Sequence, residues 1–369
     1  VTQLRQELGE SLSSIQRFSK VPEQATTADL QAFSAWSRGL EHAYHGRIHE
    51  ARLLFQRAVE LDPSFAFGWS QMSANYWRTG RPELAAATAR KAYQLRLRAS
   101  EFEQSRITFR YHLYATGDVQ QASETVALHK QLFPRDWGGF ASITSIYNPT
   151  GRYEQAVAEA RQGISLNPKF APVRRNLAFS LLRLNRFGEA RELIAQARQL
   201  QMDAPDFHEV LYQIAFATGD AAGMQQQLDW ARGTPDEYLA LSWQTGAAAF
   251  AGQWRKAQDF ARRALELTAR GDTQEIAARY ATEQALRGAV FGLCQQAEAD
   301  AAQGLQLVRG RASLPRAALA FALCGEVKQA QLLVDELTKL YPQDTLLNQL
   351  WLHAPRAALE LQSGQAARA

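Results

Sequence analysis

The sequence predicts an all-α protein, a right-handed superhelical solenoid built from antiparallel helix pairs. Two observations support this fold class. Small residues recur along the chain at steps close to 34 residues, and a glycine or its usual substitute lies five residues before nearly every one. The central small positions are Ala51, Ala85, Ala122, Ala156, Ala190, Met224, Ala257, Ala297 and Ala330. The turn positions are Gly46, Gly80, Gly117, Gly151, Asn185, Gly219, Gly252, Gly292 and Gly325. Each period therefore predicts a helix, a tight turn and a second helix.

The stretch EARLLFQRAVELDP, residues 50 to 63, shows why the repeated residues have these sizes. Two antiparallel helices need small side chains where their backbones approach most closely, and Ala51 and Ala58 supply them. Phe55 lies between the two alanines and fills the gap to the next unit. Gly46 can adopt the left-handed conformation that ends the first helix, and Pro63 stops the second. Because no unit can bury its apolar face alone, the units are expected to stack.

The repeat divides the chain into units in order. Nine complete units are expected at residues 32–65, 66–99, 103–136, 137–170, 171–204, 205–237, 238–271, 278–310 and 311–344, with the first helix of a tenth near 346–363. Units one to seven make a predicted segment 32–271, and the remaining units make a segment 272–369. The step of 40 between Ala257 and Ala297 predicts an insertion at 269–277, which either lengthens helices or forms a loop.

Residues 1–31 precede the first unit and predict an amphipathic helix followed by a loop. An apolar stripe supports the helix, and Thr27 is the expected N-cap of the first repeat helix. The stripe consists of Leu4, Leu8, Leu12 and Ile15. We expect this segment to cap the exposed end of the array. The alternative is a lever that joins the array to whatever precedes it.

Composition excludes several classes of protein. A hydrophobic content of 46% with 21% charged residues is typical of a folded chain rather than a disordered one. The net charge of +4 over 369 residues is too dilute for the basic stripe of a nucleic-acid-binding protein. The sequence contains no run of 18 apolar residues, the signal that would predict insertion into a membrane. Its first residues lack the pattern of a signal peptide.

Sequence motifs of catalysis and metal binding are also missing. The chain lacks the nucleotide-binding, zinc-protease and serine-hydrolase signatures, so we expect neither an enzyme nor a cofactor. His42, His45 and His49 are close in sequence, but the turn at Gly46 separates them and no carboxylate completes a known zinc spacing. Cys294 and Cys324 are the only cysteines. Two buried thiols are expected there, with a disulfide between neighbouring turns as the alternative.

The hollow side of such an array, lined by the first helix of every unit, is the expected binding surface. Aligning the units on their central small residues places aromatic and arginine side chains there, the types that most often anchor protein interfaces. The predicted partner-binding residues are Trp36, Tyr44, Trp77, Arg78, Tyr111, Tyr114, Arg175, Asn176, Phe179, Arg183, Gln213 and Trp243. The alternative for any single aromatic residue is packing of helix against helix.

The pattern resembles the tetratricopeptide repeat family. The signature positions are matched by Gly39, Ala51, Phe55, Ala58 and Pro63 in the first unit and by Trp69, Met72, Tyr76, Gly80, Ala85 and Ala92 in the second. The resemblance implies binding of a protein or peptide. The groove lacks the Lys and Asn arrangement with which some tetratricopeptide co-chaperones bind a C-terminal carboxylate, so a peptide with apolar anchors is expected.

Three stretches resemble a narrower group, the C-terminal repeat region of large bacterial signalling proteins common in acidobacteria. They span residues 4–33, 216–241 and 341–369. In that group the repeats follow serine/threonine protein kinases or winged-helix regulators, usually after one membrane-spanning helix. The resemblance implies a sensory or docking region outside the cytoplasm, with a cytoplasmic location as the alternative. The chain departs from the group at Pro149 and Pro355, where the helix ends are uncertain.

The sequence therefore predicts a non-enzymatic scaffold that binds a peptide or protein in its concave groove, as part of a signalling protein. Two alternatives stay open. The array could regulate an attached kinase or transcriptional effector by flexing, without a peptide ligand. It could also sense a small molecule or carbohydrate, with Trp77, Tyr111 and Trp243 as stacking platforms.

Overall fold

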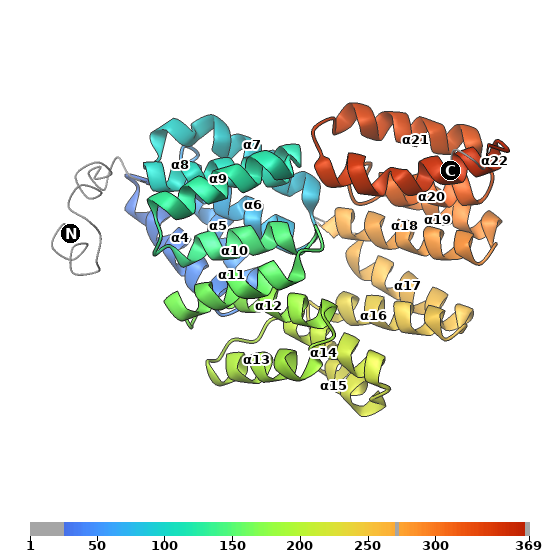
Figure 1. Ribbon diagram of the computed structural model, residues 1–369, viewed down its shortest axis with the longest axis horizontal. Coiled ribbons are helices and arrows are strands. Elements are labelled where there is room, and N and C mark those ends of the chain that lie inside the picture. Colours follow the sequence, from blue (N-terminus) through green and yellow to red (C-terminus); the bar gives the residue numbers. More distant parts are fainter. Residues whose placement is uncertain (1–25, 270–272, 366–369) are drawn as a thin grey trace.

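A computed structural model describes residues 26–269 and 273–365 of the chain (Figure 1). Every regular element in these two ranges is helical, and successive helices pair antiparallel along the chain. This confirms the predicted all-α superhelical solenoid of helix pairs, while the number of complete repeats stays a prediction. Of the predicted N-terminal cap, only residues 26–31 fall within the described ranges.

The helices alternate between first and second members of a pair. The early elements are α4 (Leu30–Tyr44), α5 (Ile48–Leu61), α6 (Ala66–Arg78), α7 (Pro82–Leu95), the 3-10 turn η1 (Arg96–Arg98), α8 (Glu101–Arg110), the π-helical η2 (Tyr111–Thr116), α9 (Val119–Leu132), α10 (Trp137–Tyr147), α11 (Tyr153–Leu166), α12 (Ala171–Arg183) and α13 (Phe187–Gln199). The later elements are α14 (Pro205–Thr218), α15 (Ala221–Ala231), α16 (Glu237–Phe250), α17 (Trp254–Thr268), α18 (Gln274–Val290), α19 (Cys294–Leu307), α20 (Leu314–Leu323), α21 (Val327–Leu340), the π-helical η4 (Leu347–Trp351) and α22 (His353–Gln362).

The predicted turn positions all have left-handed backbone. Their φ angles lie between 57° at Asn185 and 84° at Gly46 and Gly325. This conformation is open to glycine without a steric cost and to asparagine at a small one, which explains the residue types. Gly364, where the turn of a tenth unit would fall, also has a φ of 75°.

The central small residues lie where the two helices of a pair meet. The alanines at these positions, from Ala51 to Ala330, are 0% exposed. Met224 replaces alanine in α15 and is only half-buried. Phe55 is 3% exposed and packs beside Ala51 with residues of the following pair, including Met72 and Tyr76. The residue sizes read from the repeat are therefore those that the helix packing requires.

The structure shows the N-cap of the first repeat helix and the position of the predicted insertion. The N-cap of α4 is Asp29 rather than Thr27, because the Asp29 side chain accepts hydrogen bonds from the backbone N–H groups of Gln31 and Ala32. The Thr27 hydroxyl instead donates to the carboxylate of Asp62, beyond the end of α5. The extra residues near 269–277 lengthen α18 to 17 residues, while residues 270–272 lie outside the described ranges.

The spiral closes on itself. In Figure 1 the helices α4 to α13 form one half of the molecule and α16 to α22 the other, joined below through α14 and α15. Hydrogen bonds link the two halves directly. The carboxylate of Glu275 accepts from the backbone N–H groups of Glu83 and Leu84, at 2.7 and 3.0 Å. The Thr345 N–H donates to the carbonyl of Gly117 at 3.0 Å.

Arg311 is the most heavily bonded residue of this contact. Its guanidinium donates to the carbonyls of Tyr114 and Ala115 and pairs with the carboxylate of Asp344 at 3.0 Å. The Arg311 N–H also donates to the Glu83 carboxylate. We call the bonds made by residues 83–84 and 114–119 with residues 275, 311 and 345, together with the Arg311–Asp344 pair, the closure contact. It fastens the second and third helix pairs to the last ones.

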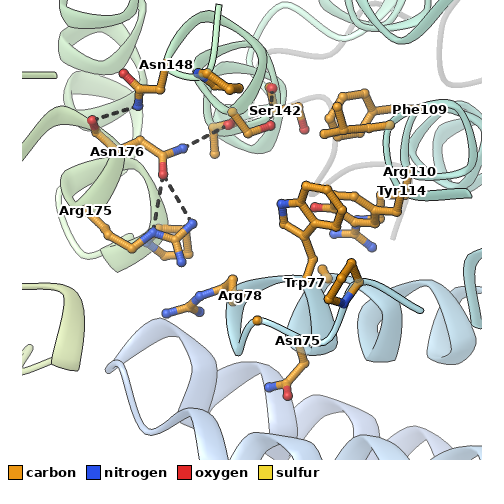
Figure 2. Close-up of a pocket in the computed structure, with 18 of the residues that line it drawn as sticks. Asn75, Trp77, Arg78, Phe109, Arg110, Tyr114, Ser142, Asn148, Arg175 and Asn176 are labelled. Carbon is orange, nitrogen blue, oxygen red and sulfur yellow. Dashed lines mark hydrogen bonds between the residues drawn. The ribbon is translucent and has the colours of Figure 1, made fainter. Parts of the chain in front are cut away.

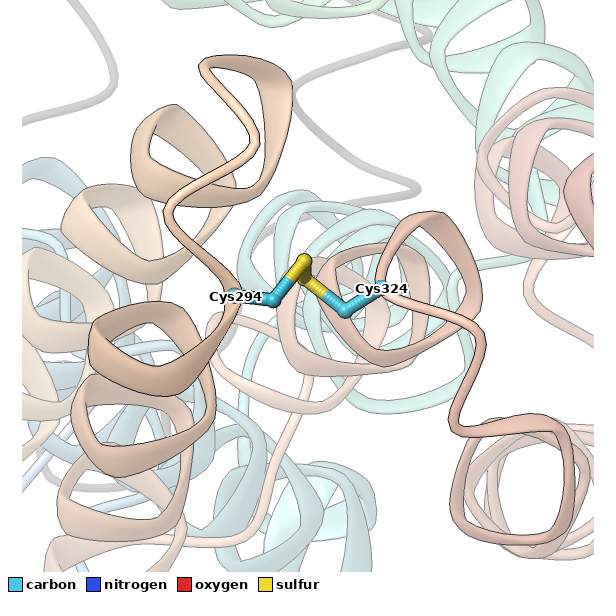
Figure 3. The surroundings of a disulfide bond; sticks show 2 residues. All are labelled: Cys294 and Cys324. Atoms are coloured by element: carbon cyan, nitrogen blue, oxygen red, sulfur yellow. A yellow bond between two sulfur atoms is a disulfide. The ribbon is translucent and has the colours of Figure 1, made fainter.

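The two cysteines form a disulfide bond, which corrects the expectation of free thiols (Figure 3). Cys294 begins α19 and Cys324 follows the end of α20, so each lies beside the turn of its own helix pair. Stacking of successive pairs brings these turns together, with a Cα–Cα distance of 5.4 Å. This distance falls in the range that a disulfide requires. The repeat period predicts that both cysteines lie beside turns, but it does not distinguish two free thiols from a disulfide bond.

Candidate ligand cavity

A cavity of about 810 Å³ lies on the inner side of the spiral. Its walls come mainly from the first helices of successive pairs, α4, α6, α8, α10 and α12. Residues of the closure contact and of α20 and η4 form the remaining wall. Pockets that hold small ligands or short peptides have volumes of this order. Closure of the spiral therefore turns an open groove into a bounded chamber.

Most of the predicted binding residues line this chamber. They are Tyr44, Trp77, Arg78, Tyr114, Arg175, Asn176, Phe179 and Arg183. They come from three first helices, α4, α6 and α12, and from η2. A large part of the predicted set is thus brought together in space, although whether it binds a partner stays a prediction.

Trp36 and Tyr111 lie away from the chamber. The Trp36 ring packs between Phe65 and Phe67, with centroid distances of 5.8 and 5.9 Å. Tyr111 stacks on Tyr93 at 4.0 Å, against the second helix of the preceding pair. For these two residues the alternative of helix packing describes the structure.

Gln213 and Trp243 also do not line the chamber. The Gln213 amide donates to the carboxylate of Glu209 one turn earlier in α14. Trp243 lies in α16, 5.5 Å from the ring of Tyr212. The three stacking platforms proposed for a small molecule, Trp77, Tyr111 and Trp243, are therefore not assembled into one site.

Aromatic rings form one wall of the chamber. Trp77 and Tyr114 stack nearly parallel, with centroids 4.7 Å apart and an interplanar angle of 20° (Figure 2). Tyr44 meets Trp137 edge-on at 5.5 Å farther along the wall. Flat faces of this kind bury large areas of a ligand with little loss of side-chain entropy.

Arginines dominate the polar part of the lining. The lining arginines are Arg78, Arg106, Arg110, Arg175, Arg183, Arg279, Arg311 and Arg316. The lining carboxylates are those of Asp206 and Asp344. Sequence reasoning found three of the arginines. It missed Arg106 and Arg110, which are on the inner face of α8. It could not find Arg279, Arg311 and Arg316, which reach the chamber only because the spiral closes.

Some of these arginines have carboxylate partners. Arg106 lies 3.8 Å from Asp136, and Arg316 lies 3.6 Å from Glu283, behind the chamber wall. Arg311 pairs with Asp344 in the closure contact. These charges are balanced within the protein and serve to hold the wall together.

Arg78, Arg110 and Arg175 are balanced less well. Arg78 and Arg175 share one carboxylate, that of Asp206, each at 3.8 Å. Arg110 is 8% exposed, and its guanidinium donates a hydrogen bond to the neutral hydroxyl of Ser70 at 2.9 Å. The carboxylate that acts on Arg110 is that of Asp136, which already pairs with Arg106. Four arginines therefore share two aspartates, a surplus of two positive charges. Buried charges in proteins are normally paired, so this surplus is unusual.

The titration of these groups reflects the same environment. Burial, followed by repulsion from Arg175, lowers the pKa of Arg78 to about 9. Burial and repulsion from Arg106 lower the pKa of Arg110 to about 10. Burial raises the pKa of Tyr114, although all these arginines oppose that shift. Tyr114 is thus the common neighbour of the arginine cluster.

The asparagines of the chamber wall orient other groups. The Asn176 amide donates to the Ala141 carbonyl and the Thr144 hydroxyl, while its oxygen accepts from the Arg175 guanidinium (Figure 2). Asn148 donates to the carbonyl of Asn176 from the neighbouring pair. Asn176 therefore fixes the position of Arg175.

Glu209 in α14 is the strongly shifted carboxyl group of this region. Burial raises its pKa to about 7, and the charge of Asp206 adds to the effect, while Arg279 and Arg183 oppose it. Glu209 lies behind the lining residues rather than in the lining itself.

Within residues 26–269 and 273–365, no cluster of three or more histidine, cysteine or carboxylate side chains has the geometry of a metal site. His42, His45 and His49 each have a separate partner, Arg47, the carbonyl of Glu41 and Asp236. No helix among the described residues is long and apolar enough to cross a membrane.

Comparison with known proteins identifies the repeat in part of the chain. Residues 150–214 match the tetratricopeptide repeat family. This range runs from the turn after α10 into α14. Among curated proteins no match was found.

Several solved structures are similar to this chain at low sequence identity. PilW, a widely conserved type IV pilus biogenesis factor, is 16% identical, covering 56% of this chain and 94% of its own, with a TM-score of 0.34. The pilF protein of Pseudomonas aeruginosa is 18% identical over 63% of this chain and 97% of its own, with a TM-score of 0.32. A Rap protein complexed with competence and sporulation factor is 10% identical over 86% and 99%, with a TM-score of 0.49. At these identities a likeness concerns the fold alone.

Proposed function

We propose that this chain is a non-enzymatic repeat region that binds a short peptide inside the closed spiral. The observation that supports this most directly is the chamber itself: about 810 Å³, walled by the first helices of successive pairs and rich in aromatic and arginine side chains. A space of this size excludes a folded domain as its occupant. The partner in the chamber is therefore a short or extended segment.

The aromatic wall anchors the apolar side chains of that peptide. Trp77 stacks on Tyr114, and Phe179 lies on the neighbouring wall in α12. Tryptophan and tyrosine at the centre of a binding surface contribute most of the affinity in typical interfaces. The eight predicted residues that line the chamber, from Tyr44 to Arg183, are the proposed binding set.

We place this region in a bacterial signalling protein, such as one that carries a serine/threonine kinase, on the resemblance of residues 4–33, 216–241 and 341–369. The Cys294–Cys324 disulfide supports a position outside the cytoplasm, because disulfides persist in oxidising compartments. Regulation of an attached effector by flexing of the array, without a ligand, is less well supported, because the closure contact holds the two halves together.

Capture of peptides from a synthetic pool tests the proposal. The immobilised chain is incubated with randomised hexapeptides, and bound peptides are identified by mass spectrometry. Trp77→Ala should lower the affinity of the captured peptides by about tenfold or more, since it removes a central aromatic anchor. Phe250→Ala is the matched control, because Phe250 is an aromatic residue 82% exposed at the end of α16 and outside the chamber. Equal binding by both variants and the unsubstituted chain would contradict the chamber as the site.

A further inference from the structure

The arginine cluster beside Tyr114 has more positive charge than Asp206 and Asp136, the carboxylates that act on it, can balance. Arg78, Arg110 and Arg175 lie around the ring of Tyr114, and Asp206 is the carboxylate that two of them share. Figure 2 shows Arg78 of α6 and Arg175 of α12 on one side of the Trp77–Tyr114 pair, and Arg110 of α8 beside the Tyr114 ring. Convergence of cations from separate elements is costly for the free protein, because like charges in a poorly solvated space repel one another.

We propose that this cluster, the Arg78–Arg110–Arg175 site, binds an acidic side chain of the peptide, so that the ligand of the chamber is an acidic peptide. This inference rests on the proposed function and specifies the chemistry of its ligand. The carboxylate occupies the space between the three guanidinium groups, beside the Tyr114 ring. Apolar residues of the same peptide then pack on the Trp77–Tyr114 wall.

Arginine is the side chain suited to this task. Its planar guanidinium presents several N–H donors and binds a carboxylate through two parallel hydrogen bonds. Asn176 already holds the Arg175 guanidinium through its amide oxygen, at 3.2 and 3.3 Å. Ser70 holds Arg110 at 2.9 Å. Two of the three donors are therefore oriented before the ligand arrives, which lowers the entropy lost on binding.

Asp206 gives the site an internal competitor. Its carboxylate stands 3.8 Å from both Arg78 and Arg175, farther than a good hydrogen bond. It therefore reduces the repulsion in the free protein without occupying the donors of either arginine. A ligand carboxylate that forms direct hydrogen bonds to these arginines is favoured over this loose arrangement.

Three hexapeptide pools separate the sources of negative charge. The first contains Asp and Glu among neutral residues and has a free C-terminus. The second replaces Asp and Glu by Asn and Gln, and the third keeps the acidic residues but has an amidated C-terminus. We expect the first and third pools to be captured about tenfold better than the second, the difference that one or two charge-assisted hydrogen bonds make.

Substitutions then locate the effect. Arg78→Gln with Arg110→Gln leaves Arg175 paired with Asp206 and removes the surplus of two charges. This variant should capture the acidic and neutral pools equally. Asp206→Asn increases the surplus and should raise the affinity for the acidic pools by about threefold to tenfold. Arg191→Gln is the matched control, because Arg191 is exposed on the second helix α13 and should leave capture unchanged.

The outcomes distinguish the inference from the proposed function. Capture of neutral and acidic pools to the same extent by the unsubstituted chain would overturn the acidic ligand and leave peptide binding in place. A preference that amidation abolishes would also overturn it, since the C-terminal carboxylate would then be the bound group. Capture of no peptide would contradict the proposed function itself. A gain of binding in Asp206→Asn would not arise from arginines that serve only to support the fold.

Discussion

The turns within the helix pairs differ in how closely later parts of the chain pack on them. Around Gly46 and Gly117 in the first half, the turns are covered by later parts of the chain: a Cβ atom at Gly46 would lie 2.5 Å from the carbonyl oxygen of Asp203, and one at Gly117 would meet Asp344. We call this the covered edge. At Gly219, Gly252 and Gly292, which follow one another along the spiral, and also at Gly151, nothing lies within 4 Å. We call this the open edge.

The open edge is unusually apolar. Phe250 is 82% exposed there, and Phe216 meets it at 5.3 Å. Val290 and Phe291 are 69% and 53% exposed at the following turn. Both edges consist of the same local motif, a glycine with positive φ between two helices. What differs is the position of each turn along the spiral, so burial of a repeat position depends on the superhelix as well as on the repeat.

The strongest test of this difference substitutes equivalent glycines on the two edges. Gly46→Ala forces alanine into left-handed backbone and also pushes its Cβ against the Asp203 backbone, so we expect a loss of about 3 kcal/mol in the free energy of unfolding. Gly252→Ala has only the backbone strain, about 1 kcal/mol. Urea unfolding of both variants measures the difference. Equal losses would mean that the covered edge is not packed as described.

The second test breaks the closure contact through a charge pair. Arg311→Ala leaves the Asp344 carboxylate buried without its partner and removes two bonds to backbone carbonyls, which should cost about 3 kcal/mol of stability. Arg309→Ala is the matched control two residues away. Its pair with Glu336 is local and exposed, and such pairs contribute about 0.5 kcal/mol. If both substitutions lower the urea midpoint equally, closure is not a source of stability.

The third test concerns Glu209, which lies in the interior of the molecule, and measures how the free energy of unfolding depends on pH. Burial raises the pKa of Glu209 to about 7, above its value of 4.5 in the unfolded chain. The folded protein therefore favours the protonated form of Glu209. The contribution of this group to the free energy of unfolding is present in full below pH 4.5 and is lost as pH rises through 7. Because Glu209 is half-buried, Glu209→Gln should raise the free energy of unfolding at pH 8 by roughly 1 to 2 kcal/mol, and leave it unchanged at pH 4.

Glu192→Gln is the control for this comparison. Glu192 also accepts a hydrogen bond from a glutamine four residues later, Gln196, but it is exposed. Its substitution should have no effect at either pH. A Glu209→Gln variant that gains no stability at pH 8 relative to pH 4 would show that this carboxyl group is ionised freely in the folded protein.

The smallest effect is expected on the open edge. Phe250→Gln removes an exposed ring, so the free energy of unfolding should change by less than about 0.5 kcal/mol. Thermal unfolding and light scattering measure stability and self-association together. A loss well above this value would indicate that the open edge packs against something in solution, and the contrast between the edges would then need revision.

The fold follows from the sequence because its determinants are local. The φ angles at Gly46 and Asn185, and the complete burial of Ala51 and Ala190, depend on contacts within one helix pair and its neighbour. Such contacts repeat with the sequence period, so counting residues is enough to find them. The same reasoning placed Trp77, Tyr114 and Arg175 on the inner face, where they line the chamber.

The features that the sequence did not predict depend on the superhelix, which is the sum of small rotations between successive helix pairs. Arg311 and Arg316 reach the chamber because the later pairs return to the earlier ones, which no local pattern encodes. Trp36 and Tyr111 occupy equivalent positions to lining residues but pack on neighbouring rings instead. The disulfide was only the alternative to free thiols for a related reason, since the distance between two turns depends on how successive pairs stack.

Closure also changes how the molecule would respond to tension. An array of stacked helix pairs lengthens elastically when its ends are pulled, much as a spring does, because each pair contacts only its neighbours. Here Glu83, Arg311 and Thr345 bridge positions more than 200 residues apart in sequence. Extension must first rupture these few bonds, so the coil would stay stiff up to a threshold force and yield abruptly beyond it.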